Sequence, residues 1–374
     1  MKNIKYEKLF GIVFSLFILT FSVIFLFSRK IEFSENENRY LASFPHLSFS
    51  NLQSGKLTEG IEDYLADHFP FRDFFMSVKT KTELAIGKEM IDDVYIGSDE
   101  YLIQNYQKPE NGNKIVDLLN QFYGDMNYIN MNLMLVPTSI TINEEKLPSY
   151  APTYSQVEEM NAIYSKIKFD TIDVTEALRN GNQEYQMFYR LDHHWTSYGA
   201  YYAYLEFCKS NNITPLAITE FDIQEVTDNF NGTLYSKTNL YTLTPDKIHI
   251  FIPKNHNYEV NYVFSNRITD TLYEEKYLDQ KDKYSYFLDN NHPLITITNQ
   301  DIHNGKELLI IKDSYANSMI PFLVNHYEKV HVIDPRFYKF SIEDYLRENT
   351  NIRDLLILYN MNTVDQDLGI LTIG

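Results

Sequence analysis

The stretch 307–359 reads ELLIIKDSYANSMIPFLVNHYEKVHVIDPRFYKFSIEDYLRENTNIRDLLILY and alternates apolar runs with segments of helical spacing. The apolar runs predict strands at 307–312, 329–334 and 353–359. The segments between them predict helices at 315–328 and 341–348. Near-continuous apolar strands joined by amphipathic helices are typical of a parallel sheet with helices on both faces. This stretch therefore indicates an α/β fold.

The same alternation extends toward the N-terminus. Further strands are predicted at 94–97, 129–137 and 171–175, and further helices at 154–168 and 196–211. Over residues 213–300 the alternation stops, and short β-like runs such as KIHIFI and YEVNYVF are separated by polar turns. We interpret 213–300 as an inserted β-rich segment, either a subdomain or a lid. The whole domain, a mostly parallel sheet flanked by helices, is expected to cover 91–374.

The N-terminal segment differs from the rest of the chain. Residues 9–28 are twenty consecutive residues without a charge, and as a helix they span about 30 Å, the thickness of the hydrocarbon core. A cleaved secretory signal has a shorter apolar core and a small-residue cleavage site, which LFSRKIEF does not supply. A buried core helix is the remaining alternative. We expect an uncleaved single-pass anchor within 1–30.

The charges around this segment predict its orientation. Three lysines precede the apolar run and two basic residues follow it, which favours an N-terminus on the inner side of the membrane. Residues 31–90 are expected to form a linker and a helical lead-in that is broken at Pro70. The catalytic part of the chain would then be extracytoplasmic, at the cell surface.

The net charge excludes one class of partner. Residues 1–30 carry five basic and one acidic side chain, so the rest of a chain with net charge −18 carries −22. Nucleic-acid binding requires a basic surface, so no nucleic-acid partner is expected. The acidic body would also be repelled by the anionic inner leaflet, which agrees with export. The single cysteine, Cys208, lies in a helical pattern and is expected to be a small buried side chain.

Ser314 is a candidate nucleophile because it follows a predicted strand and begins a predicted helix. Ligands of open α/β sheets bind beyond the carboxyl ends of the strands. The free N–H groups and the positive end of the helix dipole can stabilise an oxyanion. The alternative is that Asp313 or Ser314 only caps the helix, which is a common role of both residue types.

A second candidate group lies in YRLDHHW at 189–195. Asp192 and His194 are two residues apart, so in an extended segment their side chains face the same side. A carboxylate can then orient the imidazole, and the imidazole can take the proton of a serine hydroxyl. We therefore predict a catalytic triad of Ser314, His194 and Asp192.

Other roles of this group remain open. The histidines could be a structural hydrogen-bonded pair, or Asp192 and a histidine could bind a metal ion. A metal site needs a third and usually a fourth ligand, and no further cluster with ligand spacing occurs, so neither a metal nor another cofactor is expected. Trp195, the single tryptophan, could stack on a sugar or pack in the core beside the site.

The motif resembles the signature of the DHHW protein family, which is named for the tetrapeptide at 192–195. Seven further blocks match this family: ENRYLASFP at 37–45, DHFPFRD at 67–73, VYIGSDEYL at 94–102, LVPTS at 135–139, FNGTLYSKT at 230–238, IKDSYANSMIPFL at 311–323 and RDLLILYN at 353–360. The family is similar to the SGNH-like domains of alginate O-acetyltransferases. There an Asp-x-His-Trp motif and a later serine form the triad, and Asp192, His194 and Ser314 match them.

The resemblance implies an SGNH-hydrolase-like fold and two-step acyl transfer through an acyl-serine. Candidate oxyanion or substrate contacts are Asn291, Asn317, Thr138, Ser139 and Trp195. The chain departs from the usual pattern at Lys312, where a glycine ordinarily precedes the Asp-Ser pair. This departure concerns the turn around the nucleophile.

The resemblance also implies a substrate and a partner. An acetyl group would be moved to hydroxyls of a cell-surface or exported polysaccharide, and an integral-membrane acyltransferase of the MBOAT type would supply it. One alternative is a carbohydrate acetyl esterase with the same triad, in which water is the acceptor. The others are a non-catalytic polysaccharide-binding or assembly protein and a metal-dependent hydrolase.

Overall fold

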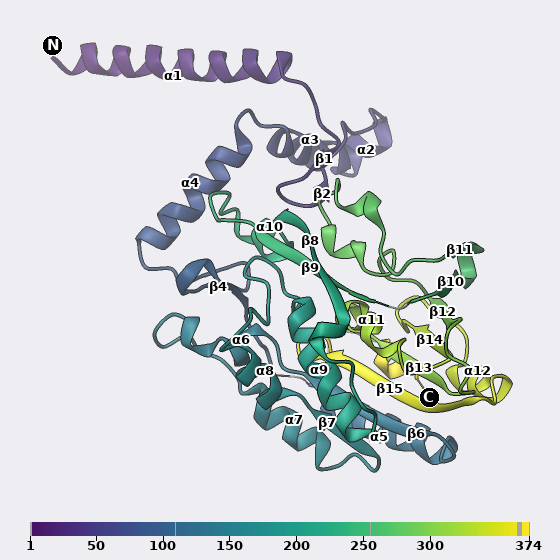
Figure 1. The fold of residues 1–374 in the computed structure, drawn as a ribbon. Coiled ribbons are helices and arrows are strands. Elements are labelled where there is room, and N and C mark those ends of the chain that lie inside the picture. The colour runs from purple at the N-terminus through teal and green to yellow at the C-terminus, as the bar shows by residue number, and fades with distance from the viewer. Residues whose placement is uncertain (1, 109, 255, 365–368, 374) are drawn as a thin grey trace. The chain divides into compact units, whose positions relative to one another are not determined.

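The computed structural model describes residues 2–108, 110–254, 256–364 and 369–373. The chain divides into two compact units (Figure 1). The smaller unit comprises residues 1–88 together with 235–242, and the larger unit comprises 89–234 and 243–374.

The smaller unit consists mainly of helices. Its elements are α1 (Lys2–Phe27), β1 (Phe33–Ser34), β2 (Arg39–Tyr40), α2 (Phe49–Gln53), α3 (Lys56–Asp67) and α4 (Arg72–Ala85). Within the described part of the chain, Lys5–Phe27 is the one helical span that is long and apolar enough to cross a membrane, with a mean hydropathy of 2.7. The predicted break at Pro70 is confirmed, because α3 ends before this residue and α4 begins after it.

The larger unit is built on a central eight-stranded sheet, which confirms a mixed α/β fold. The strand order is β11-β10-β12-β14-β13-β15-β6-β7. The strands are β6 (Asn130–Val136), β7 (Asp170–Asp173), β10 (Tyr258–Tyr262), β11 (Arg267–Thr269), β12 (Leu294–Asn299), β13 (Glu307–Lys312), β14 (Lys329–Ile333) and β15 (Ile352–Asn360). The run from β14 to β7 is parallel, whereas β12, β10 and β11 are antiparallel.

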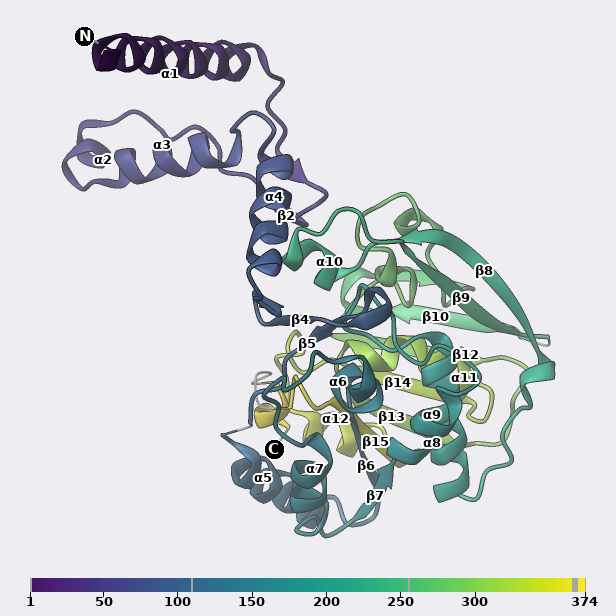
Figure 2. The same ribbon diagram turned by 90° about the vertical axis from the view of Figure 1, so that its left-hand side faces the viewer.

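Helices cover both faces of this sheet (Figure 2). They are α5 (Gly112–Asp125), α6 (Ser139–Ile142), α7 (Gln156–Tyr164), α8 (Thr175–Gly181), α9 (Ser197–Ser210), α11 (Ile320–Leu323) and α12 (Ile342–Glu348). On β13, Leu308 and Ile310 pack with α8, α9 and α11, whereas Leu309 and Ile311 pack with α5, α7 and α12. The near-continuous apolar strands are thus explained, because every side chain of such a strand is buried on one face or the other.

The segment 213–300 contains the predicted β-structure but does not form one separate body. β8 (Phe221–Phe230) and β9 (Asp246–Pro253) make a two-stranded antiparallel sheet, and α10 (Thr233–Thr238) lies between them in sequence. β10, β11 and β12 instead extend the edge of the central sheet. The prediction of a lid or subdomain is therefore wrong for these three strands. Their apolar residues Val260, Tyr262, Ile295 and Ile297 belong to the core of the sheet.

Two other predictions are corrected. The strand at 94–97 is β4 (Val94–Ile96), which pairs with β3 (Met90–Ile91) and β5 (Leu102–Gln104) in a small antiparallel sheet rather than in the central one. The helix predicted over 315–328 is replaced by a 3-10 helix, η7 (Ser314–Ser318), and by the short α11. Pro321 explains the break, because it lacks the N–H that a continuous α-helix would bond to the carbonyl of Asn317.

Candidate active site

His194 connects the two parts of the site that are distant in sequence. Its Nδ1 lies 2.6 Å from Oδ1 of Asp192, and its Nε2 lies 2.8 Å from Oγ of Ser314. An ionised carboxylate only accepts hydrogen bonds, so Nδ1 carries the proton and Nε2 accepts from the serine hydroxyl. The structure thus brings the three predicted triad residues into one hydrogen-bonded chain, the geometry of a base-activated nucleophile.

The Asp192–His194 pair owes its geometry to a tight turn. The backbone N–H of His194 also donates to Oδ1 of Asp192, at 3.0 Å. An aspartate that accepts the N–H two residues later forms an Asx turn, so the segment is bent rather than extended. Helix α9 begins directly afterwards, where the Thr196 hydroxyl caps it by accepting from the N–H of Gly199 at 3.3 Å.

The second carboxylate oxygen of Asp192 is held by the FNGTLYSKT block. Oδ2 accepts from the backbone N–H and from the hydroxyl of Thr233, at 2.8 and 3.0 Å. The residue before Thr233 must be glycine, because a Cβ on Gly232 would lie 2.3 Å from Cβ of Asp192. Burial alone would raise the pKa of Asp192, but the charges of His193 and His194 and the hydrogen bonds of His194 and Thr233 outweigh it and lower this pKa.

Ser314 begins the 3-10 helix, and Asp313 before it is the cap. Oδ1 of Asp313 accepts from the N–H of Tyr315 at 2.9 Å. Its Oδ2 accepts from the backbone N–H and the side-chain amide of Asn360, both at 2.7 Å, and from the hydroxyl of Thr363. Asp313 is therefore the residue that caps the helix. The hydroxyl of Ser314 does not serve as the cap and instead contacts His194. The carboxylate of Asp313 ties the turn of the serine to the end of β15.

Tyrosines fix the imidazole and the serine turn together. The ring of Tyr284 stacks on the ring of His194, with centroids 3.7 Å apart and an interplanar angle of 10°. Its hydroxyl donates to the carbonyl of Ser314 at 3.2 Å, and burial raises its pKa, so it stays protonated. The hydroxyl of Tyr315 donates to the carbonyl of His193. Rotation of the imidazole away from Ser314 would break this stack.

Trp195 is fully buried beside the site. Its indole N–H donates to the carbonyl of Tyr315 at 2.9 Å, and none of its surface is exposed. Of its two predicted roles, the structure favours packing in the core over stacking on a sugar.

Two of the oxyanion candidates, Asn291 and Asn317, are in contact with each other. The amide of Asn317 donates to Oδ1 of Asn291 at 3.3 Å, and Nζ of Lys312 donates to the same oxygen at 2.6 Å. In a 3-10 helix, side chains three residues apart lie one above the other, so Asn317 shares the face of Ser314. Oδ1 of Asn317 is buried and makes no hydrogen bond within the described residues.

Lys312 is buried completely at the end of β13. Its Nζ also lies 3.4 Å from Oδ2 of Asp334, and Nη2 of Arg336 contacts the same oxygen at 2.6 Å. Burial lowers the pKa of Lys312, and the charge of Asp334 opposes this shift. The departure from glycine at this position therefore gives a polar network in which a lysine orients the side chain of Asn291.

The other two candidates lie in a separate network. The backbone N–H of Thr138 donates to Oε1 of Gln156 at 2.8 Å, and its hydroxyl accepts from Nε2 of the same residue at 3.0 Å. The hydroxyl of Ser139 accepts from the amide of Asn143 at 2.9 Å. These hydrogen bonds join Thr138 and Ser139 to Gln156 and Asn143 rather than to the three triad residues.

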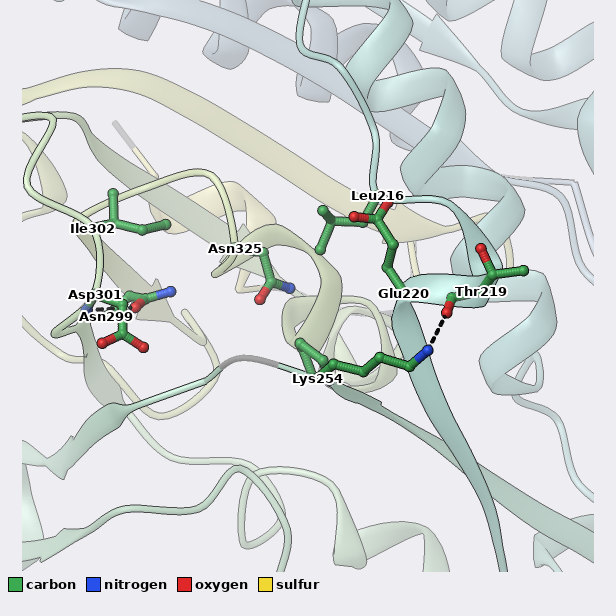
Figure 3. A pocket seen from close by; sticks show the side chains of 9 residues that line it. Leu216, Thr219, Glu220, Lys254, Asn299, Asp301, Ile302 and Asn325 are labelled. Carbon is green, nitrogen blue, oxygen red and sulfur yellow. Dashed lines mark hydrogen bonds between the residues drawn. The ribbon is translucent and has the colours of Figure 1, made fainter.

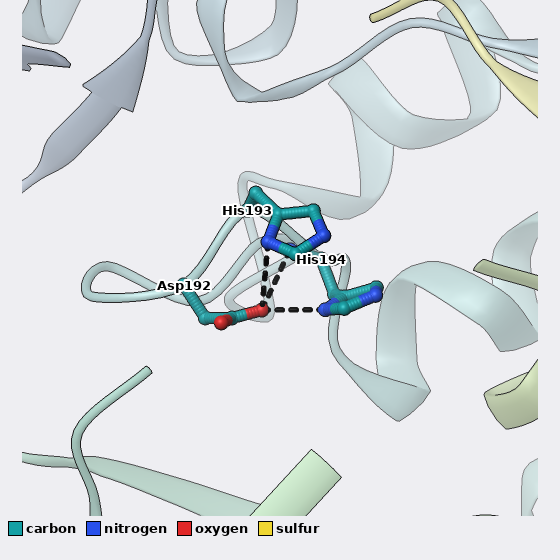
Figure 4. Close-up of side chains that lie close together, drawn as sticks. All are labelled: Asp192, His193 and His194. Carbon is teal, nitrogen blue, oxygen red and sulfur yellow. Dashed lines mark hydrogen bonds and ion pairs between the residues drawn. The ribbon is translucent and has the colours of Figure 1, made fainter. Parts of the chain in front are cut away.

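Asp192, His193 and His194 are also close enough to suggest metal ligands. One potential ligand atom of each lies within 4.8 Å of the others (Figure 4). Nδ1 of His193 lies 2.7 Å from the hydroxyl of Thr233, whereas both nitrogens of His194 are engaged by Asp192 and Ser314. A metal ion bound here would have to replace the hydrogen bonds that link these side chains.

A pocket of 340 Å³ lies beside β9 and β12, lined by Leu216, Thr219, Glu220, Pro253, Lys254, Asn299, Asp301, Ile302 and Asn325 (Figure 3). Several of its polar groups already have partners in the protein. Nζ of Lys254 donates to the carbonyl of Thr219 at 2.7 Å (Figure 3), and the amides of Asn299 and Asn325 donate to backbone carbonyls. No nucleophile paired with a base lies among its lining residues.

Three residues that shape the site were not predicted from the sequence. Thr233 lies in the block FNGTLYSKT, which matches the family. The polar residue directly after Gly232 in this block could have indicated a contact with the site. Lys312 departs from the usual glycine, but no local pattern indicates its burial against Asn291. Tyr284 is one of 30 tyrosines in a stretch without a motif, and no signal in the sequence distinguishes it.

Three solved structures are similar to this chain, and the first two share its fold. A DHHW family protein from Eubacterium siraeum is 24% identical, with 75% of this chain and 96% of that chain covered and a TM-score of 0.66. Bacillus cereus PatB1, solved with a sulfonyl adduct, is 20% identical, with 74% and 97% covered and a TM-score of 0.61. The O-acetyltransferase domain of Pseudomonas putida AlgJ is 12% identical, with 73% and 92% covered and a TM-score of 0.47. No curated protein matches the chain significantly.

The family model described as DHHW protein matches residues 85–333. This range is more than half of the 374 residues and includes both the Asp192–Trp195 motif and the turn of Ser314. The prediction made from the sequence motifs is therefore confirmed. The chain belongs to the DHHW protein family.

Proposed function

We propose that this protein is a membrane-anchored, extracytoplasmic O-acetyltransferase that moves acetyl groups to hydroxyls of a cell-surface or exported polysaccharide. The observation that carries the proposal is the hydrogen-bonded chain from Asp192 through His194 to Ser314, with distances of 2.6 and 2.8 Å. A hydroxyl in contact with an oriented imidazole is the arrangement that acyl transfer requires.

The reaction has two half-reactions. His194 Nε2 takes the proton of Ser314, and Oγ attacks the carbonyl carbon of the acetyl donor. The donor oxygen leaves with the proton from His194, and acetyl-serine remains. In the second half His194 takes the proton of a sugar hydroxyl, whose oxygen attacks the acetyl-serine, and Ser314 recovers its proton. Asp192 stays ionised throughout and stabilises the imidazolium.

The oxyanion that forms in each half-reaction needs hydrogen-bond donors. Asn317 supports this role because it shares the face of Ser314, and one of its two amide hydrogens is engaged with Asn291. Nζ of Lys312 donates to the side-chain carbonyl oxygen of Asn291 and so fixes this side chain. The fixed oxygen of Asn291 in turn orients the amide of Asn317. Preorganised donors of this kind are worth about 3–4 kcal/mol of transition-state stabilisation.

We assign acetyl as the acyl group and a polysaccharide as the acceptor from the resemblance to alginate O-acetyltransferase domains. The sulfonyl adduct of PatB1 agrees with the chemistry proposed for Ser314, because sulfonyl reagents react with activated hydroxyls. The donor would be an integral-membrane acyltransferase of the MBOAT type, and no cofactor is needed for the two half-reactions. The span Lys5–Phe27 would hold the enzyme at the membrane, with the N-terminus inside.

The direct test uses the full-length purified chain in detergent with an aryl acetate donor and a panel of neutral and acidic oligosaccharides. Acetylated sugar detected by mass spectrometry, absent with Ser314→Ala, supports the transferase. Acetate as the only product would indicate a carbohydrate acetyl esterase instead. Neither product, together with no labelling of Ser314 by an aryl sulfonyl fluoride, would favour the non-catalytic role.

A further inference from the structure

The beginning of α4 exposes a continuous apolar stripe. Phe74, Phe75 and Val78 stand at positions i, i+1 and i+4, so they lie on one side of the helix, and Phe71 is the N-cap residue directly before it. They are 63%, 62%, 41% and 43% exposed, and Phe69 just before the helix is 43% exposed. These five side chains, here called the apolar stripe, form a contiguous apolar patch of the kind that marks an interaction surface.

The opposite side of the same segment is fixed by polar contacts with residues 36–42. Asp67 accepts from Arg39 Nη1 at 2.9 Å and from the N–H of Ala42 at 2.8 Å. Asp73 accepts from the amide of Asn36 at 2.6 Å. The contacts of Asp67 join the sequence blocks ENRYLASFP and DHFPFRD, which the catalytic site does not use. They turn the polar residues of the second block inward and leave its phenylalanines outward.

The apolar stripe also touches the membrane-spanning helix. The ring of Phe21 in α1 lies 5.4 Å from Phe69, 6.4 Å from Phe71 and 6.1 Å from Phe75, measured between centroids. Phe21 precedes the end of α1 at Phe27 by six residues, which is about 9 Å along a helix. Apolar faces of interfacial helices lie about 5–10 Å deep at the boundary of headgroups and acyl chains. The distance of Phe21 from the end of the span therefore agrees with the depth at which an interfacial helix lies.

We propose that the apolar stripe inserts into the outer leaflet of the bilayer around α1 and forms a second membrane contact of the protein. This inference rests on the proposed anchor. The occupant is lipid rather than a protein partner because the stripe is continuous with the apolar surface of the span through Phe21. The membrane would thus hold the lead-in segment by two elements, one that crosses the bilayer and one that lies in its surface.

The test measures the depth of spin labels in the full-length chain. Single cysteines replace Phe14, Phe74, Val78 or Glu176 in a Cys208→Ala background, and the labelled chains are reconstituted into phosphatidylethanolamine–phosphatidylglycerol liposomes. Phe14 lies within the span, and Glu176 in the larger unit is 76% exposed and serves as the aqueous standard. Phe74 and Val78 are exposed, so their replacement removes no core packing, and an unchanged unfolding temperature in detergent checks this.

The expected result is a several-fold higher ratio of oxygen to nickel-chelate accessibility at positions 74 and 78 than at 176. The corresponding depth is about 5–10 Å below the phosphates, shallower than position 14. If position 14 is in the bilayer while 74 and 78 match 176, the inference is overturned and the anchor stands. If position 14 is also aqueous, the anchor and the inference both fail.

Discussion

Nε2 of His194 lies 2.8 Å from Oγ of Ser314, across 120 residues of sequence. This separation is a normal hydrogen bond between a hydroxyl and an imidazole nitrogen. Because Asp192 engages the other nitrogen at 2.6 Å, the lone pair of Nε2 faces the serine. The proposed base and the proposed nucleophile are therefore in direct hydrogen-bond contact.

Replacement of any one of the three hydrogen-bonded triad residues should abolish most of the catalytic activity. Ser314→Ala and His194→Gln are each expected to lower kcat for an aryl acetate by at least about 10³-fold, and Asp192→Asn by about 10³–10⁴-fold because it favours the wrong tautomer. Steady-state hydrolysis rates measure this. The three residues act as a unit, so the double variant of Ser314 and His194 should lose no more than the worse single variant. Additive losses would mean that the two residues act independently.

Thr233 is expected to support catalysis by positioning Asp192. Thr233→Val removes the hydroxyl that donates to Oδ2 at 3.0 Å but keeps the backbone N–H bond. A hydrogen bond to a charged group contributes about 1.5–3 kcal/mol, so kcat should fall about tenfold, with KM little changed. Thr233→Ser retains the hydroxyl and is the matched control. An equal loss in the serine variant would show that packing, not the hydrogen bond, matters.

The two sets of oxyanion candidates can be separated by alanine substitution. Asn317→Ala should lower kcat by about 10²–10³-fold, because it removes a donor on the face of Ser314. Ser139→Ala should change kcat by less than about threefold, because Ser139 belongs to the network of Asn143. Kinetics with the aryl acetate, at an unchanged unfolding temperature, decide the matter. A larger effect of Ser139→Ala would move the oxyanion site to the end of β6.

Asp192 should make stability depend on pH in the acid range. Its folded-state pKa lies below the ordinary value of 3.8, so the unfolded chain binds the proton first as the pH falls. The contribution of the carboxylate to the free energy of unfolding is complete above about pH 5 and decreases by about 1.4 kcal/mol per pH unit below pH 3.8. Urea unfolding of the wild type and Asp192→Asn between pH 3 and pH 7 measures the difference. A difference that is constant with pH would contradict the lowered pKa.

The metal-dependent alternative makes opposite predictions for His193. In the triad mechanism this side chain is not needed, although it contacts Thr233 at 2.7 Å, so His193→Ala should keep kcat within about tenfold of the wild type. Dialysis against a chelator should leave the activity unchanged. If chelation removes activity, zinc restores it and His193→Ala is inactive, the three neighbouring side chains bind a catalytic metal.

The sequence predicted the fold where the signal was local. The apolar runs at 307–312, 329–334 and 353–359 became β13, β14 and β15, because a strand that is buried on both faces needs an unbroken apolar run. The helix at 315–328 failed because a tertiary turn around Asp313 and the missing N–H of Pro321 outweigh helical spacing. The signal for that break, a proline inside the pattern, was present in the sequence.

The candidate site was predictable only in part. Asp192 and His194 could be paired from their spacing, although an Asx turn rather than an extended segment unites them. Their meeting with Ser314 followed from the position of a serine at the end of a strand and from the family motif. Tyr284 and Lys312 could not be assigned, because their roles depend on contacts with His194 and Asn291 that no local pattern encodes.

The order of the central sheet affects how the protein can mature. β15 lies between β13 and β6, yet it is the last strand of the sheet in sequence, and Asn130 bonds Asp354 across 224 residues. A nascent chain that has been synthesised as far as residue 340 already contains Asp192, His194 and Ser314 but lacks the strand that joins β13 to β6. It also lacks Asn360, which holds Asp313 beside the serine. The arrangement of Asp192, His194 and Ser314 can therefore be completed only after β15 has been synthesised.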